Sequence, residues 1–154
     1  MAREMTFNEF SNYLANNVSP QVETTLSRII SLCCEKVRSD IQDSMAHTAR
    51  DTTRNYYTNN KTTPHHPSLP GNPPAPDTGN LRNSIRYEIH NEGKEIYGIV
   101  GTTQKDPNYG EYLEYGTTKM APRPWLRPAM LKNESWIRSS ITKAVADGMR
   151  GVSR

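Results

Sequence analysis

The longest regular pattern in the chain is a set of apolar residues that keeps to one face of a helix. Apolar side chains recur every three or four residues at Val22, Leu26, Ile29, Cys33, Val37, Ile41 and Met45. This spacing is typical of an amphipathic helix. Ser19-Pro20 suits its start, with Ser as the cap and Pro in the first turn.

The length of this helix constrains the fold. Continued to about Asn55, it would be on the order of 50 Å long, whereas a compact domain of 154 residues is roughly 40 Å across. The helix therefore either breaks near Ser44 or His47, or its end reaches a neighbouring subunit, which we favour. Thr6-Phe-Asn-Glu9 has the spacing of a capping box and predicts a shorter helix over 7–17, so that helices occupy 6–55.

A proline-rich segment follows. Six of the eleven prolines fall within residues 57–78. Proline fixes φ and has no amide hydrogen, so neither a helix nor a central strand can form there. We expect an extended, flexible loop.

The remaining residues, 79–154, predict a small sheet and two further helices after a short helix that begins at Asp77-Thr78. Arg86–Asn91 and Glu95–Gly101 suit an antiparallel hairpin with a turn at Gly93. Tyr109–Tyr115 can be a strand or a helix, and we favour the helix. The prolines around Trp125-Leu126 indicate an extended, third edge strand, and a last helix begins at Pro128 with Trp136 or Ile137, Ile141, Val145 and Met149 on its buried side. The predicted fold is a single α+β domain over 1–154.

The composition indicates a protein with a largely polar surface. Only 34% of the residues are hydrophobic, mean hydropathy is −0.81, and eight tyrosines outnumber two phenylalanines and two tryptophans. Tyr is common at interfaces because it joins an apolar ring to a polar tip, although some of these rings can also cap a thin core. The adjacent Cys33 and Cys34 diverge on a helix, so we expect them to be reduced and partly buried. No apolar run has membrane-spanning length, and no signal-peptide core follows Met1, so we expect the protein to be cytoplasmic where it is made.

Charge is distributed unevenly. From Lys119 onward the chain has eight Lys/Arg and two Asp/Glu, whereas residues 1–118 have eleven and fourteen. The basic part can face nucleic acid or an acidic partner, or it can be a solvated helix face.

No set of residues has the spacing of an active site. His65-His66 lies in the proline-rich segment without further ligands at metal spacing. Glu111 and Glu114 lack a third acidic partner, and nothing near Ser68 or Ser84 would activate a hydroxyl. We therefore expect no enzyme, no cofactor and no metal.

Three motifs in fixed order carry a resemblance. They are Thr78-Gly-Asn-Leu-Arg-Asn-Ser-Ile85, Tyr112-Leu-Glu-Tyr-Gly-Thr117 and Lys119-Met-Ala-Pro-Arg-Pro-Trp-Leu-Arg-Pro128. With them the chain resembles the tail-completion (neck) family of long-tailed bacteriophages, also called minor tail or head-tail joining proteins. Two departures stand out: Gly110 replaces a frequent Ala, and the proline-rich loop is long.

The resemblance implies a small α+β subunit that assembles into a ring, a hexamer or a dodecamer, at the head-tail junction of the virion. Its partners would be the head-closure or connector protein and the tail terminator or tail tube protein. DNA in transit would contact the lumen weakly and without sequence specificity, and no membrane is involved.

The motif residues then receive expected roles. Assembly contacts are expected from Arg82, Tyr112, Glu114, Tyr115, Arg123 and Trp125, with Arg82 pairing Glu114 within a subunit or across to the next. A role in the subunit fold is expected for Thr78, Gly79, Leu81, Ile85, Leu113, Gly116, Thr117 and Leu126. Arg82, Arg123 and Trp125 can equally serve the subunit fold alone.

Two other functions stay open. The protein can be a tail terminator or head-closure ring, which the sequence separates poorly from tail completion. It can also be an accessory protein that binds DNA through the basic C-terminal part, with an affinity that falls steeply with salt.

Overall fold

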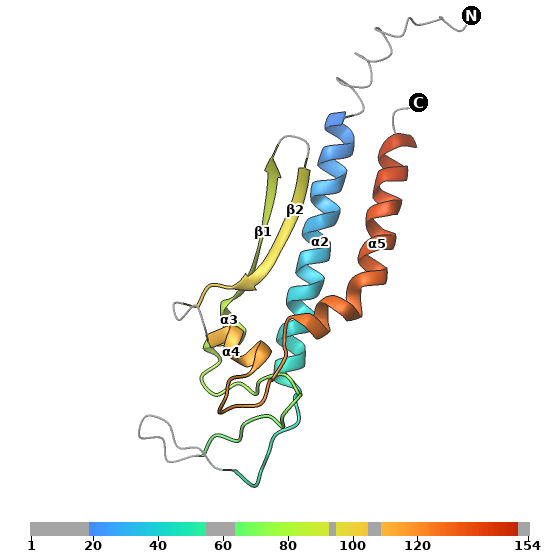
Figure 1. The fold of residues 1–154 in the computed structure, drawn as a ribbon. Helices are drawn as coiled ribbons and strands as arrows, with labels where there is room; N and C mark the ends of the chain where they lie inside the picture. Colours follow the sequence, from blue (N-terminus) through green and yellow to red (C-terminus); the bar gives the residue numbers. More distant parts are fainter. Residues whose placement is uncertain (1–18, 55–63, 93–94, 105–108, 151–154) are drawn as a thin grey trace, which may run out of the picture. The chain divides into compact units, whose positions relative to one another are not determined.

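The structure is a computed structural model that describes residues 19–54, 64–92, 95–104 and 109–150. It contains helices α2 (Ser19–Ala46), α3 (Asn80–Ser84), α4 (Tyr109–Tyr115) and α5 (Arg127–Arg150), and the strands β1 (Ile85–Glu92) and β2 (Glu95–Thr102) (Figure 1). The α+β fold predicted from the sequence is confirmed. The helix expected over 7–17 lies outside the described residues.

Helix α2 has the predicted face and a shorter length. Cys33, Val37, Ile41 and Met45 are all buried. The helix ends at Ala46, not at Asn55, so the favoured continuation to Asn55 is wrong and the alternative, a break beside His47, is confirmed. The backbone turns away because the next residues bond to the proline-rich segment, beginning with Thr48 Oγ1, which donates to the Pro73 carbonyl (2.8 Å).

The described residues pack as two compact units, and the long elements pass through both. One unit contains residues 34–87 and 99–134, and it holds most of the buried side chains. Its apolar core joins four helices and the start of β1, through Val37, Ile41, Met45, Leu81, Ile85, Leu113, Trp125 and Ala129. A single domain over 1–154 stays a prediction.

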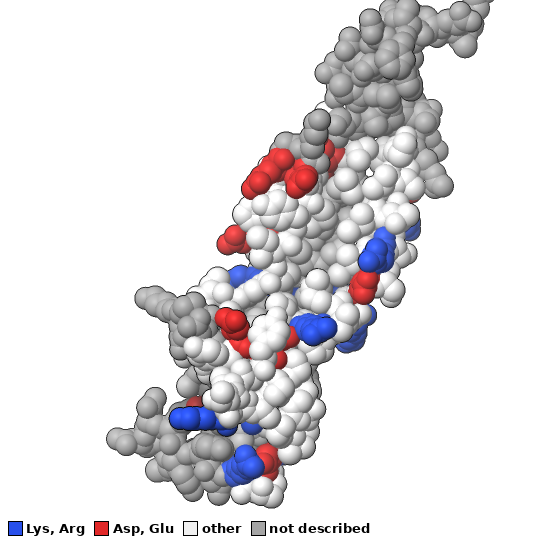
Figure 2. Space-filling view, viewed as in Figure 1, with Lys and Arg blue, Asp and Glu red and all other residues white. Residues whose placement is uncertain are grey.

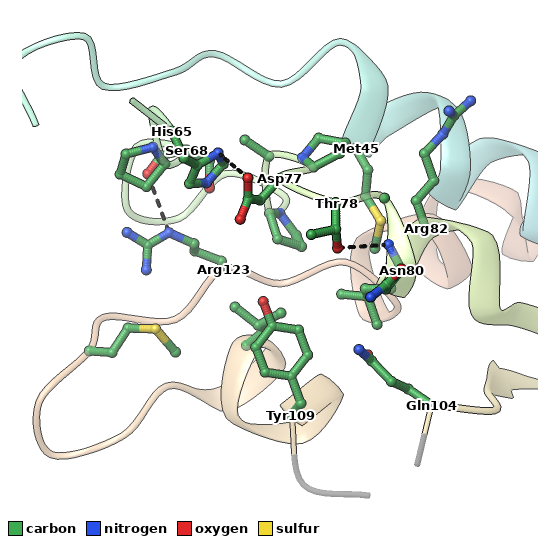
Figure 3. A pocket seen from close by; sticks show the side chains of 18 of the residues that line it. Met45, His65, Ser68, Asp77, Thr78, Asn80, Arg82, Gln104, Tyr109 and Arg123 are labelled. Carbon is green, nitrogen blue, oxygen red and sulfur yellow. Dashed lines mark hydrogen bonds and ion pairs between the residues drawn. The ribbon is translucent and has the colours of Figure 1, made fainter. Parts of the chain in front are cut away.

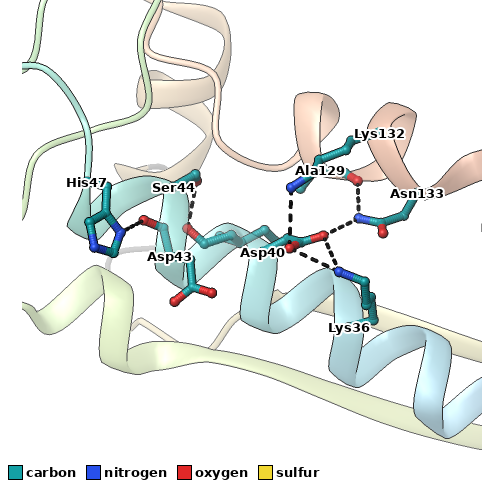
Figure 4. A network of polar contacts seen from close by, with 9 residues as sticks. Lys36, Asp40, Asp43, Ser44, His47, Ala129, Lys132 and Asn133 are labelled. Carbon is teal, nitrogen blue, oxygen red and sulfur yellow. Dashed lines mark hydrogen bonds and ion pairs between the residues drawn. The ribbon is translucent and has the colours of Figure 1, made fainter.

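A polar network joins α2 to α5 within this unit (Figure 4). Asp40 accepts hydrogen bonds from Asn133 Nδ2 (2.7 Å) and Lys36 Nζ (3.1 Å), and Lys132 Nζ lies 3.4 Å from its other oxygen. Asn133, itself buried, also donates to the Ala129 carbonyl (2.9 Å). Burial alone would raise the pKa of Asp40, but the hydrogen bonds and the two lysine charges lower it below the usual range.

The proline-rich segment is held by backbone hydrogen bonds from Pro67 onward. An antiparallel bridge pairs Arg50 with Ser68, flanked by bonds from Asp51 N–H to Pro67 O (2.7 Å) and from Leu69 N–H to Ala49 O (3.2 Å). Gly71 N–H then donates to the Pro122 carbonyl (2.9 Å). Proline carbonyls accept two of these three bonds, and Leu69 and Gly71 have N–H groups to donate, so the absence of proline N–H groups does not prevent the pairing. The first part of the loop, residues 57–63, lies outside the described residues.

The second unit contains residues 19–33, 88–98 and the end of α5 from 135. Small residues carry the packing of α5: Ala144 is 4% exposed, and a Cβ added to Gly148 would lie 3.2 Å from Val22 Cγ2. The expected buried position of Met149 is wrong, since its side chain is 60% exposed. Gly148 faces Val22 of α2, so Met149, the next residue along the helix, points in a different direction.

The hairpin has a defined register in this second unit. The rings of His90 and Tyr97 stack with centroids 5.2 Å apart, so these residues face each other across the strands. Glu92 and Glu95, which end β1 and begin β2, are therefore opposite each other, and Glu88 shares their face by alternation along the strand.

The third strand expected around Trp125-Leu126 is wrong. The sheet formed by the described residues has the order β1-β2 alone, and residues 121–126 are irregular. Pro122 and Pro124 have no N–H to donate, and the N–H groups of Trp125 and Leu126 both donate to Glu114. No described helix is long and apolar enough to cross a membrane.

Candidate assembly surface

The first motif, 78–85, builds the turn from the proline-rich segment into α3. Gly79 has φ +79°, a left-handed conformation that favours glycine. The helix begins at Asn80 with Gly79 in the N-cap position, and not at Asp77-Thr78 as expected. Thr78 Oγ1 accepts a hydrogen bond from Asn80 N–H (3.3 Å). Leu81 and Ile85 are buried, Ile85 completely, although Ile85 lies at the first position of β1 and not on the helix. These residues act in the subunit fold.

Arg82 bonds to α2. Its Nε donates to the Gln42 carbonyl (3.1 Å), and Gln42 Nε2 donates back to the Arg82 carbonyl (2.9 Å). The described part of the subunit contains no Arg82–Glu114 ion pair, because both groups have other partners. A pairing across two subunits stays a prediction.

Glu114 on α4 serves the start of α5. Its carboxylate accepts hydrogen bonds from the N–H groups of Trp125 (2.7 Å), Leu126 (2.9 Å) and Arg127 (2.9 Å). The first N–H groups of a helix have no partner in the helix itself, and the helix dipole favours a negative charge beside them. Leu126, half-buried, completes the first turn when its carbonyl accepts Met130 N–H (3.0 Å). Glu114 thus joins two helices through backbone groups.

Trp125 is 4% exposed and lies against α4. Its indole Nε1 donates to the Gly110 carbonyl (2.9 Å). A Cβ on Gly110 would lie 3.3 Å from the indole and 3.2 Å from Thr102 Cγ2, closer than most such contacts. Glycine, where related proteins are expected to carry Ala, therefore lets the ring approach the helix backbone.

Gly116 ends α4 in a turn that no other residue fits. Its φ is +78°, and an added Cβ would lie 2.7 Å from the Met120 carbonyl oxygen and 2.9 Å from Pro122 N. Thr117 and Met120 then pair through two backbone hydrogen bonds (2.8 and 3.2 Å). The returning chain lies against α4, where Arg123 N–H donates to the carbonyl of the buried Leu113 (2.6 Å).

The Arg123 side chain reaches the proline-rich segment. Its Nε donates to the Ser68 carbonyl (3.3 Å), and its Nη1 lies 3.5 Å from the Ala121 carbonyl. Arg123 lines a cavity of about 580 Å³ between this segment, α3 and α4, within the unit of residues 34–87 and 99–134 (Figure 3). Tyr109 points its hydroxyl into the same cavity. Burial, and then the nearby Asp77 carboxylate, raise the pKa of Tyr109.

The three tyrosines of α4 are exposed, although Tyr109 also lines the cavity. Tyr109, Tyr112 and Tyr115 are spaced three residues apart and are 43%, 46% and 72% exposed, while Gly110 and Leu113 of the same helix are buried. Leu113 and Gly110, and not the tyrosines, dock the helix. Interface residues of this kind contribute most to binding when they become buried against a partner. We name Tyr109, Tyr112 and Tyr115 the tyrosine stripe.

Other expected or missed features lie outside this stripe. His65 Nδ1 lies 3.9 Å from Asp77, and His66 Nδ1 contacts the Arg54 carbonyl (3.2 Å). The described residues hold no group of three or more His, Cys, Asp or Glu that could bind a metal. Sequence reasoning missed the carboxylates of the hairpin face and the basic residues at the cavity. The alternation of Glu88, His90 and Glu92 was the available signal for the hairpin face, whereas the cavity unites segments distant in sequence.

The described residues thus form a small subunit in which most motif residues are buried or bonded within the subunit, while the tyrosines of α4 are exposed. The family model of HK97-gp10-like proteins, described as "Bacteriophage HK97-gp10, putative tail-component", matches residues 8–116. The chain belongs to this family and is a structural tail component of a tailed bacteriophage, and thus part of the virion. No curated protein and no solved structure matches the chain.

Proposed function

We propose that this chain is a tail-completion protein of the phage neck. Copies of it form a ring that joins the DNA-filled head to the tail and lets DNA pass through its lumen. Its role is structural and not catalytic. Its partners are the head-closure or connector protein and the tail terminator or tail tube protein.

Membership of the tail-component family is the observation that supports this proposal most strongly. The tyrosine stripe adds a surface suited to such contacts, because α4 is held in place by the Glu114 carboxylate, the Trp125 indole and the Gly116 turn. A helix that is already ordered loses little entropy when it docks. The exposed rings therefore favour assembly at low entropic cost.

DNA passage requires weak contacts. Tight duplex binding at physiological salt would hold the genome in the ring, since each neutralised phosphate adds to affinity. The net charge of only +3 for the whole chain fits a lumen along which DNA slides.

Electron microscopy of lysates from a phage that lacks this gene tests the proposal. Filled heads and finished tails lying separate are the expected result. Tails of abnormal length would identify a tail terminator instead, and heads emptied of DNA would identify a head-closure protein. Normally joined particles would overturn the neck assignment, and DNA binding would then be the function to measure.

Complementation tests the tyrosine stripe. A gene carrying both Tyr112→Ser and Tyr115→Ser should rescue that phage at least about 100-fold less well than wild type, because two interface anchors are lost. The thermal midpoint of the purified variant should match wild type within a few degrees, since both rings are exposed. Met149→Ser, which truncates a side chain that is 60% exposed on α5, is the matched control. Full rescue by the double variant would exclude the stripe as an assembly surface.

A further inference from the structure

The β1–β2 hairpin has an acidic face whose like charges lower the stability of the hairpin. Glu92 and Glu95 are opposite each other, and like charges in that position destabilise a strand pair. Both are exposed, as is Glu88 on the same face, where its side chain is 71% exposed. Figure 2 shows acidic side chains gathered towards the end of the hairpin. Even with Lys94, segment 88–95 has three Glu against one Lys.

Aromatic surface accompanies these carboxylates. Tyr97 on the same face is 37% exposed, and its hydroxyl donates to Glu92 Oε1 (3.0 Å). This hydrogen bond raises the pKa of Tyr97. The hairpin thus offers a ring and three negative charges together, a combination suited to a basic partner that also has aromatic groups.

The cavity beside α4 has the opposite character. Four of the residues that line it are Lys or Arg and one is acidic, and they are Arg54, Arg82, Lys119, Arg123 and Asp77. Arg54 and Lys119 are exposed, and the side chain of Arg54 is 63% exposed despite its contact with Asp51 (3.5 Å). Tyr109 lines the cavity as well and is also the first residue of the tyrosine stripe, so the cavity and the stripe are adjacent. We name Arg54, Lys119 and Arg123 the basic rim.

We propose that the acidic hairpin face of one copy docks on the basic rim and tyrosine stripe of a second copy. Charge complementarity argues for a second copy as the partner. The same chain carries both an acidic and a basic face, and two acidic faces or two basic faces would repel each other. Such a contact joins two different surfaces, so each copy keeps one of each for the next, as ring closure requires. The inference rests on the proposed ring and names its subunit contact.

Charge reversal of the full-length protein tests the contact, with self-association measured by analytical ultracentrifugation between about 0.05 M and about 0.5 M salt. One variant carries Arg54→Glu and Lys119→Glu, and another carries Glu88→Lys and Glu95→Lys. Each alone should weaken association roughly 100-fold, because attraction becomes repulsion. Arg28→Glu with Lys143→Glu, exposed residues outside both faces, imposes the same charge change as the rim variant and should have no effect.

Rescue distinguishes a specific contact from damage to the fold. The four substitutions combined in one chain, or the two variants mixed, should restore association to within about 10-fold of wild type, because the reversed faces again complement each other. Failure of both rescues, or a wild type that stays monomeric at low salt, would overturn the proposal. Loss of DNA binding by the rim variant with unchanged self-association would show that DNA is the occupant.

The gene deletion tests the neck function separately from the docking contact. If association is unaffected by charge reversal while the gene deletion still leaves heads and tails separate, the docking proposal fails and the neck function stands. Joined particles in the deletion would instead refute the neck function, whatever the ultracentrifuge shows.

Discussion

The α4–α5 junction and the β1–β2 hairpin use glutamate in opposite ways. At the junction the Glu114 carboxylate accepts three backbone hydrogen bonds from its own chain. In the hairpin Glu95 is exposed and opposite another glutamate. A charge with partners inside the subunit contributes to its stability, whereas an exposed like-charge pair slightly lowers that stability. The residues that the motifs emphasise are therefore mainly those that build the subunit.

The largest expected loss of stability comes from a substitution at the Gly116 turn of the α4–α5 junction. Gly116→Ala should lower the free energy of unfolding by about 3 kcal/mol or more, because it adds a backbone clash to a left-handed φ. Urea titration measures this loss. Gly71→Ala is the control, since Gly71 has φ +83° but no atom within 4 Å of an added Cβ; its cost should be about 1 kcal/mol. Equal losses at both sites would show that strain alone matters.

The next effect removes the charge that joins the two helices. Glu114→Gln should cost about 2 kcal/mol, because a neutral amide accepts the N–H bonds of Trp125, Leu126 and Arg127 less strongly. Glu111→Gln, an exposed change on the same helix, should stay within about 0.5 kcal/mol of wild type. If the two variants unfold alike, the capping role of Glu114 is wrong.

A smaller effect concerns the network at Asp40, whose side chain is 13% exposed. Asp40→Asn should cost about 1 kcal/mol at neutral pH. The pKa of Asp40 is lowered in the folded protein, so its contribution is present above the unfolded pKa of about 3.9 and is lost as pH falls through the folded value. The difference between wild type and variant should accordingly shrink in acid. Thermal unfolding across the acid range would contradict this if the difference grew.

The smallest expected effect is a gain in stability, and it comes from the hairpin and not from the α4–α5 junction. Glu95→Thr should stabilise the subunit by about 0.3 to 0.5 kcal/mol, since it removes a like-charge pair and adds a residue that favours strands. The same change should weaken self-association. A variant that is both less stable and unimpaired in association would show that Glu95 serves the hairpin and not the contact.

The sequence predicts local structure well and long-range polar contacts poorly. Helical periodicity locates the buried face of α2, and alternation locates the hairpin. The roles of Arg82 and Glu114 could not be predicted, because their partners are backbone groups brought close only by the fold, such as the Gln42 carbonyl. The prediction of an edge strand was wrong for a related reason. A strand at Trp125-Leu126 would need free backbone N–H groups for pairing, and the sequence does not reveal that these groups donate to Glu114.

The antiparallel pairing around Arg50 and Ser68 has a practical consequence. It fixes the chain on both sides of residues 55–63, with His66 Nδ1 still 3.2 Å from the Arg54 carbonyl. The ends of this stretch are held together whatever its length, and doubling a loop costs only about 0.6 kcal/mol. An epitope or fluorescent label inserted there should leave the subunit folded, which offers a way to detect single copies of the protein.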